Sequence, residues 1–359
     1  MYVPRASQGF HIPRLRLPFV PLAAVGVVVV AWAALSVRPT GHDALLPQPI
    51  VTDVHSVAYF ERAPGADLLM VRRAAGGASA RSVATFPRYL DFGARGSASP
   101  AGDTVAVLSV GDRPTTAAAL TLVDPASGAM RVVPGGFQYL SPVAWSNDGQ
   151  RLGVLAFSAA NESPVAVEID TASGTIAAVH RFDAALEAAP VGFTPDGRRM
   201  LVIVVDGGGS SLWSVAAGEA VRLATLTPGL TRDWTLSSDG SRLAFVERAG
   251  VGGRRYIGRV LTLATGTVQR APGDGDQLGA VWQPGTSAAE FGGPGGSLQL
   301  AASGDGYVVP RAWSPDGTTL VASVFEGGEA RTEVIKGSEW RMPLGSNEAA
   351  FIGWVRDLE

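Results

Sequence analysis

The chain contains no cysteine, so its fold cannot depend on disulfides and it offers no thiolate metal ligand, cysteine nucleophile or lipid-modified cysteine. Lysine is almost absent, with Lys336 alone among 29 basic residues, and no long block of like charge accompanies the net charge of −3. A nucleic-acid surface needs clustered lysine and arginine to neutralise phosphates. The composition therefore argues against nucleic acid as a partner.

Histidine is scarce as well, with only His55 and His180 inside the repeated region described below. The chain has no G-x-S-x-G nucleophile elbow and no EF-hand, zinc or phosphate-loop pattern. We therefore expect no catalytic residue, no cofactor and no metal site, and a protein that binds other molecules and is not an enzyme.

One long hydrophobic run lies near the N-terminus. Residues 17–37 read LPFVPLAAVGVVVVAWAALSV, carry no charge and are long enough to cross a bilayer as a helix. Arg5, Arg14 and Arg16 precede the run, which places the N-terminus in the cytoplasm and the later residues outside. We predict a cytoplasmic tail (1–16), a transmembrane signal anchor (17–37), a linker (38–50) and an extracytoplasmic domain (51–359).

A cleaved signal peptide is the alternative. Ala31 and Ala33 form an A-x-A pattern that would suit cleavage near Ala33 and secretion of the remainder. The length of the apolar run and the bulky Trp32 between these alanines favour the retained anchor.

The exported region consists of an internal repeat. Each copy has an apolar strand, a Ser-Pro-Asp-Gly turn or a variant, and a second strand. Asp-Gly supplies the positive φ that a tight hairpin requires. The copies read WSNDGQRLGVL from Trp145, FTPDGRRMLVI from Phe193, LSSDGSRLAFV from Leu236 and WSPDGTTLVAS from Trp313; degenerate copies begin at Ala98 and Trp282.

Two further strands follow most copies, so each unit has four strands, which is typical of propeller blades. The last segment, residues 349–355, resembles an inner strand without partners, and residues 51–86 supply three strands without an inner one. We predict an all-β propeller closed by pairing of its two ends. It would have seven blades, or six if residues 279–310 are not a full blade.

The WSPDG-type repeats resemble those of the TolB-like, or WD40-like, β-propellers. The resemblance covers about residues 51–358 and implies a bacterial envelope protein that binds protein partners. It also implies kinship with the propellers of prolyl oligopeptidase-type peptidases, but we expect neither their downstream hydrolase domain nor the separate N-terminal α/β domain of TolB.

Recurring aromatic and acidic residues have structural interpretations. Trp145, Phe193, Trp282 and Trp313 end inner strands, so we interpret them as wedges between blades and not as a carbohydrate platform. The aspartates before glycine are the residue type that the turn itself requires.

Candidate contact residues lie where the chain approaches each inner strand, because these loops should ring one mouth of the pore. Polar and aromatic residues gather there, as on binding surfaces. The predicted set is Arg88, Tyr89, Gln138, Tyr139, Arg232, Asp233, Asp276, Gln277 and Arg311. We expect a scaffold that holds envelope protein partners; a hydrolase or lyase in the pore, or a carbohydrate-binding sensor, is the alternative.

Retention of the anchor gives the first prediction. N-terminal sequencing of the protein isolated from its own membranes should find residues that precede Ala33. A mature N-terminus just after Ala33 would establish secretion instead.

Overall fold

The computed structural model describes residues 55–74, 79–88, 93–110, 118–134, 137–139, 143–158, 164–183, 185–250, 255–298, 300, 305–337 and 340–356. These residues form β-strands and connecting turns, without a helix that could cross a bilayer. The predicted tail, transmembrane helix and linker, together with Ala33, lie outside the described residues.

The strands, in chain order, are β1 (His55–Ala63), β2 (Ala66–Arg73), β3 (Arg81–Pro87), β4 (Arg95–Ala98), β5 (Val105–Ser109), β6 (Ala119–Val123), β7 (Met130–Val132), β8 (Phe137–Tyr139), β9 (Ala144–Trp145), β10 (Arg151–Ser158), β11 (Val165–Asp170), β12 (Ile176–Arg181), β13 (Glu187–Phe193), β14 (Met200–Asp206), β15 (Gly209–Ala216), β16 (Glu219–Thr227), β17 (Leu230–Leu236), β18 (Arg242–Ala249), β19 (Arg255–Thr262), β20 (Thr267–Arg270), β21 (Leu278–Trp282), β22 (Ala289–Gly292), β23 (Tyr307–Trp313), β24 (Thr319–Glu326), β25 (Glu329–Lys336), β26 (Trp340–Pro343) and β27 (Ala350–Arg356).

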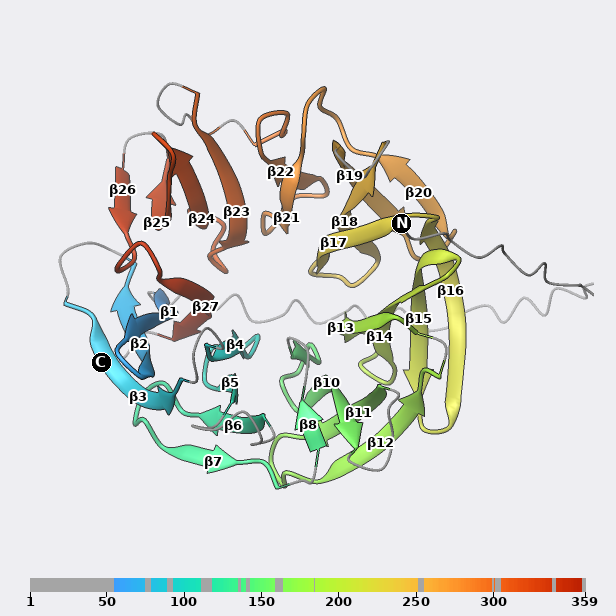
Figure 1. Ribbon diagram of the computed structural model, residues 1–359, viewed down its shortest axis with the longest axis horizontal. Helices are drawn as coiled ribbons and strands as arrows, with labels where there is room; N and C mark the ends of the chain where they lie inside the picture. The colour runs from blue at the N-terminus through green and yellow to red at the C-terminus, as the bar shows by residue number, and fades with distance from the viewer. Residues whose placement is uncertain are drawn as a thin grey trace, which may run out of the picture. The chain divides into compact units, whose positions relative to one another are not determined.

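The described strands form six four-stranded blades and one two-stranded sheet, arranged as a ring (Figure 1). The blades are β27-β1-β2-β3, β4 to β7, β8/β9 to β12, β13 to β16, β17 to β20 and β23 to β26; β8 and β9 both pair with β10 as a divided inner strand. The predicted all-β propeller is confirmed. The count of seven full blades is not, because the described residues between β20 and β23 form the two-stranded sheet β21–β22 and no further strand.

The two ends of the propeller pair with each other, as predicted. β27 lies antiparallel to β1, with Val57 opposite Trp354 and Ser56 opposite Val355. The last strand is thus the inner strand of a blade whose other strands are the first three. This pairing closes the ring and removes a pair of free sheet edges that would otherwise recruit other chains.

The hydrophobic core is divided among the junctions between neighbouring sheets. In β14, Met200 and Val202 pack toward the preceding blade, whereas Leu201 and Ile203 pack toward the next one, against Phe245. Successive residues of a strand point to opposite faces, and both faces of a blade are covered by neighbours. Strands such as β14 are therefore apolar on both faces, without alternation.

The aromatic wedges have the predicted role. The Trp145 Nε1 atom donates to the Ser97 carbonyl in the preceding blade at 3.2 Å, and Trp282 Nε1 donates to the Thr235 carbonyl at 3.1 Å. Phe193 is buried in the junction ahead of its own blade. These side chains connect the inner strand of one blade to the preceding blade.

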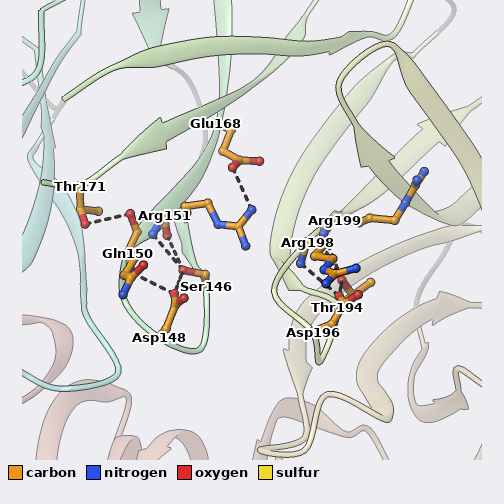
Figure 2. A network of polar contacts seen from close by, with 10 residues as sticks. All are labelled: Ser146, Asp148, Gln150, Arg151, Glu168, Thr171, Thr194, Asp196, Arg198 and Arg199. Carbon is orange, nitrogen blue, oxygen red and sulfur yellow. Dashed lines mark hydrogen bonds and ion pairs between the residues drawn. The ribbon is translucent and has the colours of Figure 1, made fainter. Parts of the chain in front are cut away.

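The repeated turn is held by its own aspartate (Figure 2). Asp148 Oδ1 accepts hydrogen bonds from Ser146 Oγ at 2.6 Å and from the Gln150 amide at 3.0 Å, while Gly149 has a φ of 70°. The same bonds recur around Asp196, Asp239 and Asp316. The carboxylates are satisfied within the turns, which supports their structural interpretation.

Asp239 provides a stability prediction with a defined pH dependence. Hydrogen bonds from Ser237 and then from the Ser241 amide lower the pKa of Asp239 from 3.8 to about 2. The ionised form is favoured by the fold, so its contribution is complete above pH 3.8 and is lost as the pH falls toward 2. Asp239→Asn should lower the free energy of unfolding by up to about 1 kcal/mol at neutral pH.

Urea unfolding of both proteins between neutral and acid pH measures this difference, which should shrink toward pH 2. Asp274→Asn is the matched control, because Asp274 is exposed and accepts no hydrogen bond from the described residues. A difference that stays constant with pH would contradict the role assigned to the ionised carboxylate.

Candidate functional site

The inner strands share an irregularity that the sequence does not reveal. The pairing of β13, β17, β21 and β23 with the next strand shifts register within each inner strand, around Val191, Asp233, Gly279 and Arg311. A bulge adds one residue to a strand and changes the direction of its side chain. Asp233 and Arg311, both predicted site residues, thus occupy bulges.

Asp233 links two of these bulges. Among the described residues other than glycine, Asp233 alone has a positive φ, at 54°. Its Oδ2 atom accepts the Gly279 amide at 3.0 Å and the Arg232 Nε atom at 3.1 Å. The Asp233 carboxylate therefore links β17 to β21. It also forms an ion pair with Arg232.

Arg311 lies near this pair. Its Nε atom donates to Ser323 Oγ at 3.0 Å, and its terminal nitrogens bond to none of the described residues. Its side chain keeps contact with solvent, yet the surrounding protein displaces enough water to lower the pKa of Arg311; nearby Asp233 opposes the shift and Arg232 adds to it. The structure thus brings together Arg232, Asp233 and Arg311.

Gln277 and Asp276 have a different role from the predicted one. Gln277 is completely buried: its Oε1 atom accepts the Gly258 amide at 2.7 Å and its Nε2 atom donates to the Pro272 carbonyl at 2.6 Å. Asp276 Oδ1 accepts the Tyr256 amide at 3.0 Å. These residues attach the segment before β21 to β19, so Gln277 cannot meet a partner at the surface.

Tyr139 and Arg88 lie apart from this cluster. Tyr139 is 4% exposed within the core of a blade junction, and burial raises its pKa. Arg88 follows β3, where its amide donates to the Gly65 carbonyl at 3.1 Å. Tyr89 and the side chain of Gln138 lie outside the described residues. His55 and His180 belong to different blades, in β1 and β12.

A cavity of about 550 Å³ opens beside Arg311. It lies between the blade β23 to β26 and the composite blade, because β23, β24 and β25 form one wall and β1, β27 and residues 347–349 form the other. Charged and aromatic side chains line it, among them Arg62, Arg311, Phe325, Arg331, Glu348 and Phe351. We call the face that carries this cavity and the loops into the inner strands the Arg311 face.

Two of the three lining arginines are already neutralised. Arg62 pairs with Glu348 at 3.2 Å. Arg331 pairs with Glu326 at 2.7 Å and also with Glu333; these bonds, chiefly the one to Glu333, raise the pKa of Arg331. The third lining arginine is Arg311. No carboxylate of a described residue lies within ion-pair distance of it.

Arg62 and Arg331 were missed by the sequence analysis, which considered only the loops into inner strands. They flank the hairpins β1–β2 and β24–β25. In an antiparallel blade, alternate connections lie at the same end, so these hairpins share a face with the loops into the inner strands. The Ser-Pro-Asp-Gly turns lie at the opposite end, which we call the Asp-Gly face.

Comparison with known proteins agrees with the fold. No protein-family model matches the chain, and no curated protein matches its sequence. The structure is similar to TolB from Acinetobacter baumannii, with 19% identity and a TM-score of 0.54 over 84% of this chain and 67% of that chain. The chain therefore has the fold of a TolB-like propeller.

Peptidase structures contain a similar fold. The Pyrococcus horikoshii acylaminoacyl peptidase has a TM-score of 0.54 and 12% identity over 81% of this chain and 52% of that chain. A prolyl endopeptidase has a TM-score of 0.52 and 13% identity over 85% and 51%. The match spans about half the length of each peptidase, so it concerns the propeller fold alone.

Gln277 gives a prediction for the two-stranded sheet. Gln277→Ala leaves the Gly258 amide and the Pro272 carbonyl without their partners in the interior, and should lower the free energy of unfolding by about 2–4 kcal/mol. Urea unfolding measures this. Gln269→Ala, at an exposed position of β20, should change it by less than about 0.5 kcal/mol. Equal effects of the two changes would refute the structural role of Gln277.

Proposed function

We propose that the chain is a membrane-anchored, extracytoplasmic propeller of the bacterial envelope that works by binding a protein partner and not by catalysis. The cavity on the Arg311 face carries the proposal. Its lining combines arginine and phenylalanine at the junction of two blades. Arginine and aromatic residues are enriched in protein interfaces and in their energetically dominant positions.

The setting of the cavity suits a preformed binding site. Its volume falls within the roughly 300–1,000 Å³ that is usual for ligand sites. Its walls are paired strands: Arg311 lies in β23, Phe325 in β24 and Phe351 in β27. A partner segment would therefore meet side chains already held in place, which reduces the entropy cost of binding.

The proposed location rests on the apolar run at residues 17–37 and on the arginines before it. A single anchor at this point would leave the propeller outside the cytoplasmic membrane. There it could hold an envelope protein close to the bilayer.

A second function is supported by the peptidase structures that share the fold. In this alternative, the same propeller would serve as a hydrolase or lyase with its site in the pore, or as a carbohydrate-binding sensor. Propellers host many unrelated functions, so the fold does not decide between the two.

Site-specific photo-crosslinking in the native membranes tests the proposal. A photoreactive residue in place of Asn347, an exposed residue that lines the cavity, should give one discrete adduct with another protein. The same replacement at Ser238, exposed on the Asp-Gly face, should not give that adduct.

Two results would contradict the proposal. An adduct of the same size from both positions would show contact without a specific face. No adduct from either, together with turnover of a glycan or peptide by the purified full-length protein, would favour the enzymatic alternative.

A further inference from the structure

One of the arginines that line the cavity has no carboxylate partner among the described residues. Arg62, Arg311 and Arg331 line it, together with the carboxylate of Glu348. Glu348 pairs with Arg62, and Glu326 and Glu333 pair with Arg331. Arg311 is the guanidinium that remains, and it lies in the wall of the cavity.

We infer that Arg311 binds a carboxylate group of a peptide segment that enters this cavity. The inference rests on the proposed function, because it names the chemistry by which the partner is recognised.

The orientation of Arg311 suits a carboxylate. Ser323 Oγ accepts the Nε proton at 3.0 Å and thereby holds the guanidinium plane. The two terminal nitrogens stay available as a pair, and such a pair matches the two oxygens of a carboxylate. Arg311 is also exposed, so a segment that enters the cavity can reach its guanidinium.

The single positive charge of Arg311 favours a carboxylate ligand over a phosphate ligand. A phosphate monoester carries about −1.5 to −2 at neutral pH and would leave charge uncompensated beside one free guanidinium. A carboxylate carries a single negative charge. It would balance Arg311 without disturbing the ion pairs of Arg62 and Arg331.

The aromatic residues indicate the rest of the ligand. The Phe325 ring stacks on Tyr307 with centroids 4.7 Å apart, and the Phe351 ring packs edge-on against Trp354 at 6.4 Å. Both phenylalanines are therefore held by a neighbour while they line the cavity. An apolar side chain next to the carboxylate would bury surface against them, which a free inorganic anion could not do.

Three labelled peptides test the inference on the full-length protein in detergent, by fluorescence anisotropy. All share one short sequence with a phenylalanine. One carries a neighbouring glutamate and an amidated C-terminus, the second has glutamine there and an amidated C-terminus, and the third has glutamine and a free C-terminal carboxylate. The glutamate peptide, the free-carboxylate peptide or both should bind at least about tenfold more tightly than the neutral peptide. Which of the two gains affinity identifies the source of the carboxylate.

Variants of Arg311 assign the effect to this residue. Arg311→Gln should remove the preference for carboxylate, and Arg311→Lys should retain part of it, because the charge remains while the paired donors are lost. Arg198→Gln is the matched control, since Arg198 is an exposed arginine beside an Asp-Gly turn. Circular dichroism on each variant confirms that the fold is kept; if Arg311→Gln does not fold, Arg311→Lys alone carries the comparison.

Equal binding of all three peptides, or a preference that persists in Arg311→Gln, would overturn the inference. So would competition by inorganic phosphate that exceeds competition by acetate. A crosslink from position 347 together with equal binding of the three peptides by the unchanged protein would overturn the carboxylate assignment and leave the proposed function standing. If the protein with Arg311 unchanged gives no crosslink from position 347, the result would instead count against the proposed function.

Discussion

The pairing of β27 with β1 is the constraint on which the remaining structure depends. These strands come from opposite ends of the propeller, and their antiparallel ladder converts a row of blades into a closed ring. The cavity has one wall from β23, β24 and β25 and the other from β1 and β27. Both walls are in place only when the ring is closed, so the candidate site depends on the pairing of β27 with β1.

Packing across the closing junction reinforces this dependence. Val57 and Tyr59 of β1 share a core cluster with Val321 and Val334 of the preceding blade. These contacts join segments that are far apart in the chain, and the loop-closure entropy must be overcome before they contribute. Residues on the rim of the cavity, such as Arg62 with Glu348, can form their ion pair only after that step.

Local chemistry explains which parts of the fold could be predicted from the sequence. The Asp-Gly turns hold themselves through bonds within a few residues, as around Asp148, and the aromatic wedge has a fixed offset from the turn. The site was less predictable because it depends on distant neighbours. Gln277 resembles an exposed loop residue until β19 buries it, and nothing near Arg311 in the sequence shows that it lacks the carboxylate partner that Arg62 and Arg331 have.

The bulge at Asp233 connects backbone strain with this site. In the described turns, a left-handed backbone conformation is taken by glycine, which adopts it without steric cost. At Asp233 the same conformation is taken by a residue for which it costs about 1–2 kcal/mol. Glycine there would relieve the strain, but it would remove the carboxylate that accepts the Gly279 amide and neutralises Arg232. The strained residue thus keeps Arg232 paired beside Arg311, which has no carboxylate partner among the described residues.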